Sequence, residues 1–216
     1  MKSLAHIVHD LVQHHAHQDR SRSGPDSNPP QYSLMGAQAH SQHAQAQNPS
    51  EQEMREYLAS LAGAYDLPVD FVHAAAKTEN HFHQTEHVNR AYRDKHGRSV
   101  PETIDYGLMQ INSRKIGHDS VKDAHGNKFK IGEDVKTDWK ANARAGVAIL
   151  AEQYELAKLE QGPVTSEQDR AQQAYSGYNG GPGNRDRYLH ERRDGLPRNP
   201  HDRNFLENYR GERARR

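Results

Sequence analysis

Glu79 is the residue of this 216-residue chain whose setting most favours acid–base chemistry. It comes near the end of an apolar helical segment, and residues 74–76, just before it, are all alanine. Burial among small apolar groups and the negative end of a helix dipole both favour a protonated carboxyl group. A carboxyl that stays protonated near neutral pH is what a general acid requires, for example to protonate a glycosidic oxygen. From position alone, a solvent-facing glutamate at a helix end is the simpler explanation.

Residues 106–112, with the sequence YGLMQIN, combine a flexible backbone with groups that could contact a ligand. Gly107 lets the backbone approach a ligand closely, Leu108 and Met109 offer an apolar wall, and Gln110 offers an amide. A buried turn would explain the same residues.

Residues 175–183, with the sequence YSGYNGGPG, form a second segment of this kind. A helix is expected to run into a glycine-rich turn there, with Tyr178 and Asn179 at the junction. Taken separately, this segment also has an ordinary structural explanation.

Residues 83–87, with the sequence HQTEH, raise the alternative of a zinc protease. They fit the H-x-x-E-H pattern, in which two histidines on one helix face bind zinc beside a glutamate. His81 is a further candidate ligand. The chain has 16 histidines, however, and the surrounding residues give no apolar stripe to anchor such a helix. We therefore predict no metal and no cofactor.

Helices are expected to position these residues. Ser50 and Glu53 form a capping box that begins the first helix, and Pro68 begins a second that carries Glu79. Further helical patterns cover residues 139–159, 166–176 and 184–192. Residues 84–106 are expected to be irregular and 127–136 are a candidate hairpin, so the fold class is mainly α.

The composition divides the chain into three parts. Residues 1–48 are predicted to be a short amphipathic helix at 4–12 followed by a disordered linker rich in His, Gln and Ser. Residues 49–190 are the expected folded domain, and residues 191–216 an Arg-rich, solvated C-terminal tail. Leu34 is the only Leu, Ile, Val or Phe between residues 13 and 50, which cannot supply a core.

Composition also excludes several classes of protein. The chain has no cysteine, which excludes a disulfide scaffold, and its formal net charge of zero gives no field to attract nucleic acid. No apolar run approaches the ~18 residues of a membrane span. Residues 3–10 are interrupted by His and Asp, unlike the apolar core of a standard signal peptide.

Together and in this order, the motifs resemble those of the soluble lytic transglycosylase and goose-type lysozyme family. The corresponding features are the catalytic Glu, a G-L-M-Q segment, an N-x-x-x-G helix and a Y-N turn, here Glu79, residues 107–110, Asn142 with Gly146, and Tyr178-Asn179 leading into residues 180–183. The resemblance covers roughly residues 53–190 and implies a lysozyme-like, mainly α domain. The G-L-M-Q segment runs on into residues 110–113, Gln-Ile-Asn-Ser. This stretch is most similar to that of the small family members found with secretion systems and phage particles.

The chain departs from the family pattern at three places. Asn80 follows the catalytic Glu where the family has Ser, and it can still donate to a carboxylate or to a substrate amide. Gly177 replaces an Ala. The stretch from residue 80 to 106 is longer and richer in His than in the family, which predicts an elaborated loop beside the substrate.

The resemblance implies cleavage of peptidoglycan at the β-1,4 bond between N-acetylmuramic acid and N-acetylglucosamine. Glu79 would act first as acid and then as base, giving 1,6-anhydromuramic ends. Tyr178 would orient Glu79 or stabilise charge beside it. The implied substrate-binding residues are Asn80, Gly107, Leu108, Met109, Gln110, Asn142, Tyr178 and Asn179.

Two alternatives keep the same substrate. A muramidase hydrolase would need a second carboxylate to hold water, for which Asp105 and Glu102 are the candidates. A structural protein would bind the glycan without cleaving it. In each case the protein would act on the bacterial cell wall in the periplasm. We expect residues 1–48 to engage a phage particle or a specialised secretion system that delivers it.

Overall fold

The capping box at Ser50 begins a helix, as the sequence predicts. In the computed structural model, which describes residues 49–93, 97–159, 166–190 and 196–216, this helix is α2, Glu51–Ala64. The Ser50 hydroxyl accepts the backbone N–H of Glu53, and the Glu53 carboxylate accepts the N–H of Ser50. The helix and linker predicted for residues 1–48 lie outside the described residues.

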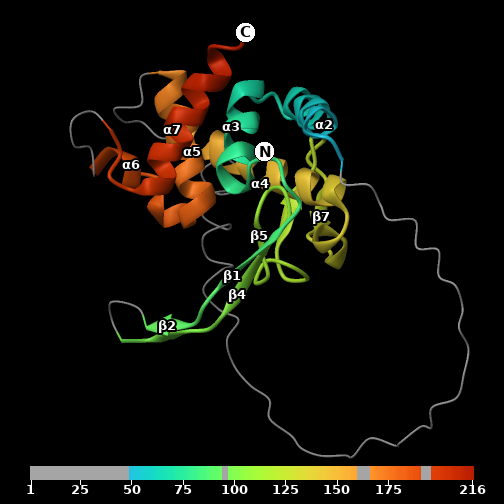
Figure 1. The fold of residues 1–216 in the computed structure, drawn as a ribbon, viewed down its shortest axis with the longest axis vertical. Helices are drawn as coiled ribbons and strands as arrows, with labels where there is room; N and C mark the ends of the chain where they lie inside the picture. The colour runs from blue at the N-terminus through green and yellow to red at the C-terminus, as the bar shows by residue number, and fades with distance from the viewer. Residues whose placement is uncertain (1–48, 94–96, 160–165, 191–195) are drawn as a thin grey trace, which may run out of the picture. The chain divides into compact units, whose positions relative to one another are not determined.

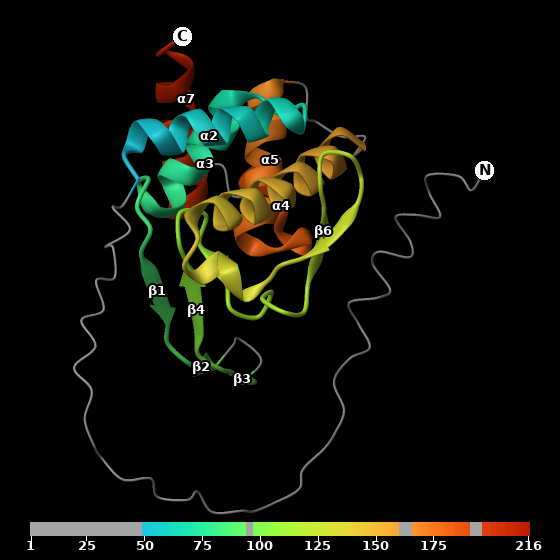
Figure 2. The same ribbon diagram turned by 90° about the vertical axis from the view of Figure 1, so that its right-hand side faces the viewer.

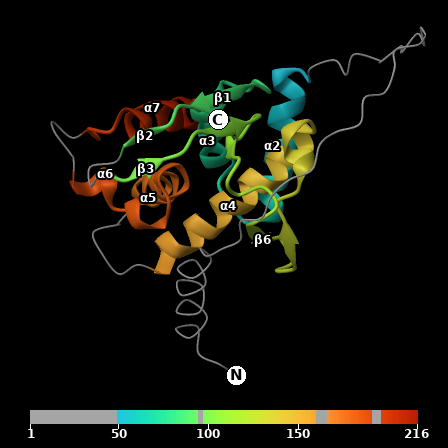
Figure 3. The same ribbon diagram turned by 90° about the horizontal axis from the view of Figure 1, so that it is seen from below.

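Helices supply most of the ordered structure, and β1 and β4 extend away from them (Figure 1). After α2, the helices are α3 (Val69–Asn80), α4 (Trp139–Leu159), α5 (Glu167–Gly180), α6 (Arg187–His190) and α7 (Pro200–Arg213), with the 3₁₀ turns η1 (Glu133–Lys136) and η2 (Pro182–Asn184). The most extensive packing joins α3 to α7 and α4 to α5. Seen from below, α4 runs between α5 and β6 (Figure 3). Within the described ranges, no helix combines the length and apolar character needed to cross a bilayer.

Short antiparallel strands occupy the stretch that the sequence predicts to be irregular. β1 (Glu86–Asn89), β4 (Thr103–Tyr106) and β5 (Ile111–Asn112) form one sheet in the order β1-β4-β5, and β2 (Tyr92–Arg93) pairs with β3 (Ser99–Val100). β6 (Ser120–Lys122) and β7 (Lys128–Lys130) form a hairpin near the one predicted. β1 and β4 leave the helices as an arm with β2 and β3 at its far end (Figure 2).

The core lies between α3, α4, α5 and α7. Phe71 of α3 contacts Tyr154 of α4 and Phe205 of α7, with ring centroids 5.2 and 5.9 Å apart. Phe205 also stacks on Tyr175 of α5. Each such side chain contributes about 1.5–3 kcal/mol by leaving water, so this aromatic cluster fixes the positions of the helices.

The C-terminal tail differs from the solvated end that the sequence predicts. Asn199 caps α7 and Pro200 occupies its first turn. Phe205 and Tyr209 have no exposed surface, and Leu206 has 2%. The folded region therefore continues beyond residue 190, because a few apolar residues on one face of an otherwise charged helix suffice to dock it.

Candidate active site

Glu79 lies one residue before the end of α3 and is partly exposed. Its Oε1 accepts a hydrogen bond of 2.8 Å from the hydroxyl of Tyr175. The side chain of Asn179 donates a second hydrogen bond to the same carboxyl group. The carboxyl is therefore held in one orientation while part of the residue stays open to solvent.

The surroundings of Glu79 tune its acidity towards neutral pH. Burial raises the pKa of Glu79 to about 7, and the negative charge of Asp105 acts in the same direction. The hydrogen bonds from Tyr175 and Asn179 oppose this rise without cancelling it. A group with a pKa near the working pH is present in both its acid and its base form, as acid–base catalysis requires.

α5 presents the two donors from one face, because Tyr175 and Asn179 are four residues apart. The sequence predicts that Tyr178 orients Glu79 or stabilises charge beside it. The Tyr178 hydroxyl donates to the backbone oxygen of Met109 at 2.5 Å, and the tyrosine that hydrogen-bonds to Glu79 is Tyr175. The i, i+4 spacing to Asn179 is the sequence signal that could have identified it.

The Gly107–Gln110 segment is a tight loop built around glycine. Gly107 has φ +73°, and an added Cβ would lie 2.6 Å from the amide nitrogen of Asn142 and 2.7 Å from that of Gln84. Leu108 and Met109 have no exposed surface. Gln110, also with positive φ, donates its amide hydrogens to the carbonyls of Gly107 and Thr85.

Asn142 of α4 holds this loop from inside the protein. It has no exposed surface, and its Nδ2 donates to the carbonyls of Tyr106 at 2.7 Å and Val135 at 3.0 Å. Its Oδ1 accepts the backbone N–H of Met109 at 2.8 Å. The side chains of Asn142, Leu108 and Met109 are enclosed, so in this structure they support the loop.

Gly146, one turn after Asn142, provides the space for Met109. An added Cβ would lie 2.4 Å from Met109 Cβ. We expect Gly146→Ala to destabilise the protein by about 1–3 kcal/mol through overpacking, which outweighs the gain of about 1 kcal/mol in helix propensity. Gly63→Ala in α2 is the matched control, because nothing lies within 4 Å of its added Cβ. Urea unfolding should show a loss for the first variant and a gain for the second, and equal effects would contradict the packing argument.

Asn80 stabilises the turn of the backbone that follows α3. His81 and Phe82 both have positive φ, of 49° and 60°. The Asn80 amide donates to the carbonyls of His83, Thr85 and Gly107 at 3.0–3.3 Å. In this structure Asn80 therefore links the end of α3 to the Gly107 loop.

The H-x-x-E-H motif does not form the helix that a zinc protease requires. α3 ends at Asn80, and residues 83–87 run through a loop into β1. Among the residues that the structure describes, no cluster of three or more His, Cys, Asp or Glu side chains could hold a metal. The zinc-protease interpretation is thus unsupported.

Asp105 is held between the flanking strands. Asn89 of β1 donates to its Oδ2 at 2.7 Å, and Asn112 of β5 donates to its Oδ1 at 2.6 Å. It is near enough to Glu79 to raise the pKa of that residue. Glu102, the other candidate water-positioning residue, is exposed between β3 and β4.

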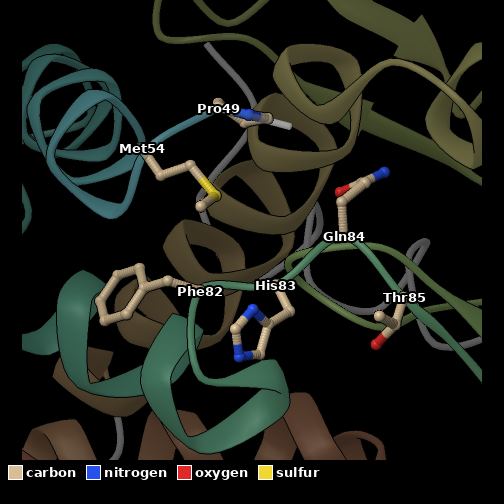
Figure 4. Close-up of a pocket in the computed structure, with 6 residues that line it drawn as sticks. All are labelled: Pro49, Met54, Phe82, His83, Gln84 and Thr85. Carbon is tan, nitrogen blue, oxygen red and sulfur yellow. The ribbon is translucent and has the colours of Figure 1, made fainter. Parts of the chain in front are cut away.

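A pocket of about 100 Å³ lies between the start of α2 and residues 82–85, which follow α3. Figure 4 shows the residues that line it: Pro49, Met54, Phe82, His83, Gln84 and Thr85. None of them is a predicted site residue. The pocket is therefore separate from the acid–base group, although Gln84 also accepts the backbone N–H of Leu108.

We expect Tyr175→Phe to lower the rate of the reaction about tenfold, since it removes a hydrogen bond that orients the acid. That hydrogen bond stabilises the carboxylate, so its loss raises the pKa of Glu79 further. The basic limb of the pH–rate profile should move to higher pH. Tyr178→Phe, which removes a hydroxyl bound to Met109, should leave that limb in place. Equal shifts in the two variants would contradict the assignment of Tyr175.

The domain is mainly helical, and it holds a glutamate with a pKa near neutral pH between a tyrosine and an asparagine. This is the arrangement of an acid–base enzyme. Residues 56–199 match the Transglycosylase SLT domain. The match covers 144 of the 216 residues, so the chain belongs to this family. No curated protein and no solved structure matches the chain significantly. The family consists of lytic transglycosylases with a lysozyme-like domain that act on cell-wall peptidoglycan, which confirms the predicted family, fold class and enzyme class.

Proposed function

We propose that this enzyme cleaves the β-1,4 bond between N-acetylmuramic acid and N-acetylglucosamine as a lytic transglycosylase. The observation that carries the proposal is Glu79, a partly exposed carboxyl with its pKa raised to about 7 and held by Tyr175 and Asn179. No other acid has this combination in the residues that the structure describes.

The reaction needs one proton, which Glu79 gives and takes back. Protonated Glu79 donates to the oxygen that leaves with N-acetylglucosamine, and the bond from muramic C1 breaks with oxocarbenium character. The ionised Glu79 then removes the proton of the muramic C6 hydroxyl. The C6 oxygen bonds to C1, which gives the 1,6-anhydro end and restores the acid.

The predicted substrate-binding residues divide into two groups by exposure. Four are partly exposed and can reach a sugar: Asn80, Gln110, Tyr178 and Asn179. Four are buried and would act by shaping the loop behind the substrate: Gly107, Leu108, Met109 and Asn142. We propose that the first group makes the polar contacts with the glycan.

Mass spectrometry of the soluble fragments released from purified peptidoglycan tests the proposal. We expect anhydromuramic ends with the wild-type protein and none with Glu79→Gln. Reducing muramic ends would reject the transglycosylase, and binding without fragments would leave a structural, glycan-binding role.

A muramidase hydrolase is the second candidate, because Asp105 places another carboxylate near Glu79. Its two asparagine donors fix the orientation of this side chain, which could then hold a water molecule. If the product is anhydromuramic, Asp105→Asn should keep that product and remove the negative charge that raises the pKa of Glu79, so this pKa falls. If the product is reducing, the same variant should abolish cleavage.

We also propose that residues 1–48 engage a phage particle or a specialised secretion system that brings the enzyme to the periplasmic wall. The support is compositional: an amphipathic spacing at residues 4–12 and a linker rich in His, Gln and Ser. Deleting residues 1–48 should leave cleavage of isolated peptidoglycan within about twofold of wild type, because a segment with so few apolar residues can add little to a core. Loss of cleavage in this assay would contradict the proposal that residues 1–48 serve delivery and not catalysis.

A further inference from the structure

We propose that α7 positions the catalytic acid, because two of its residues, Phe205 and Asp202, hold the two side chains that hydrogen-bond to Glu79. The inference rests on the proposed role of Glu79. The region that matches the family ends at residue 199, and α7 begins at the next residue, Pro200. This chain therefore supports its active site with an element beyond the matched region.

The first connection runs through an aromatic stack. The rings of Phe205 and Tyr175 lie 4.3 Å apart between centroids and within 7° of parallel. Both side chains have no exposed surface, and the Tyr175 hydroxyl reaches Glu79. The flat face of Phe205 therefore sets the plane in which the Tyr175 hydroxyl points at the carboxyl group.

The second connection runs through an ion pair. Arg187 donates to both carboxylate oxygens of Asp202, at 2.8 Å from Nε and 2.7 Å from Nη2. The same Nη2 donates to Oδ1 of Asn179 at 3.2 Å. With its oxygen held in this way, the Asn179 amide is turned so that its N–H groups can donate to Glu79.

Further contacts join α7 to the same helices. The Ser176 hydroxyl, next to Tyr175, donates to Asp202 at 3.0 Å. Asn208 donates to the hydroxyl of Thr78, the neighbour of Glu79, at 3.0 Å. The positions of both α5 and α3 at the acid thus depend on α7.

The influence of α7 on Glu79 is indirect. Among the described residues, the groups that act on the charge of Glu79 are Asp105 of β4 and Tyr175 and Asn179 of α5, with Tyr178 also facing it. Substitutions in α7 should therefore change catalysis by displacing the α5 donors. A displacement of about 1 Å at a reacting group can cost on the order of a hundredfold in rate.

A matched pair of α7 variants separates positioning from stability. Asp202 and Glu212 are both buried carboxylates on α7, and each makes two hydrogen bonds to one arginine, Arg187 and Arg55 respectively. Glu212 contacts Arg55, His73 and Arg215, none of which donates a hydrogen bond to Glu79. We expect Asp202→Asn and Glu212→Gln to lower the midpoint of thermal unfolding comparably, whereas only Asp202→Asn should lower kcat, by about tenfold or more, with little change in KM.

The variant Phe205→Leu is tested by its pH–rate profile, which a change in stability alone would not shift. It keeps an apolar side chain but removes the ring that orients Tyr175, so the basic limb of the pH–rate profile should move to higher pH. Leu206→Val, at the neighbouring buried position of α7, should leave the limb unchanged. Equal kcat values for Asp202→Asn and Glu212→Gln, or an unmoved limb in Phe205→Leu, would overturn the inference. Full activity of Glu79→Gln would instead overturn the proposed function, so the two failures are distinguishable.

Discussion

Glu79→Gln is expected to reduce peptidoglycan cleavage by about a thousandfold or more while the protein stays folded. Glutamine has nearly the same size and can still accept from Tyr175, but it can neither give nor take the proton. General acid–base catalysis contributes on the order of 10²–10⁴-fold, and Glu79 would serve in both steps of the reaction. Turnover on purified peptidoglycan, with circular dichroism to verify folding, measures the loss.

The same substitution is expected to stabilise the protein at pH 8. The pKa of Glu79 is raised from 4.5 to about 7, so between these values the folded chain holds a proton that the unfolded chain has lost. The free energy of unfolding is therefore highest below about pH 4.5 and falls as the pH rises. Above pH 7 it is reduced by the full cost of ionising the buried carboxyl group. At 1.36 kcal/mol per pH unit, that cost reaches at most about 3 kcal/mol.

Glutamine removes this cost because it carries no charge at any pH. The free energy of unfolding of the variant should exceed that of the wild type at pH 8, and the difference should disappear near pH 4.5. Glu56→Gln, on the exposed face of α2, is the matched control and should follow the wild type in both activity and stability. Wild-type cleavage by Glu79→Gln would remove Glu79 from the mechanism.

Local signals in the sequence were enough to predict the helices that carry the site. The capping box placed the start of α2, and the apolar periodicity after Trp139 gave the observed bounds of α4. Strands β1 to β5 were missed because their stability does not come from alternating burial. β1 is exposed over most of its length, and it is tied to β4 by backbone pairing and by the amide of Asn89.

α7 escaped prediction for a related reason. Its sequence is dominated by charge, and its docking depends on partners distant in the chain: Asp202 with Arg187 and Glu212 with Arg55. A one-dimensional pattern cannot distinguish a charge that meets water from one that meets a buried arginine.

The chemistry of the site was easier to predict than its geometry. Glu79 stands out by its helix-end position and its order among the motifs. Whether Tyr175 or Tyr178 donates to Glu79 depends on the rotation of α5, which its packing against α4 and α7 determines. Residue type and spacing therefore predict which residue is the acid, whereas only tertiary contacts show which side chains hydrogen-bond to it.

Asn142→Ala is expected to cause the largest loss of stability among the substitutions at the site, about 3–5 kcal/mol. The asparagine satisfies three backbone groups, and alanine would leave the carbonyls of Tyr106 and Val135 and the N–H of Met109 without it. Each buried polar group that loses its partner costs about 1–3 kcal/mol. Urea unfolding measures this loss, and cleavage should fall with it because the Gly107 loop would no longer be held in place.

Two further variants test whether stability depends on the three hydrogen bonds of Asn142 or only on the presence of a polar side chain. Asn142→Asp keeps the shape and an acceptor for Met109 but turns oxygens towards two carbonyls, so it should be at least as destabilising as alanine. Asn127→Ala, which removes an exposed asparagine from the β6–β7 turn, should change stability by less than about 0.5 kcal/mol. If Asn142→Ala costs no more than Asn127→Ala, another contact supports the loop; if it costs several times more, the buried amide is what holds the Gly107 loop in place.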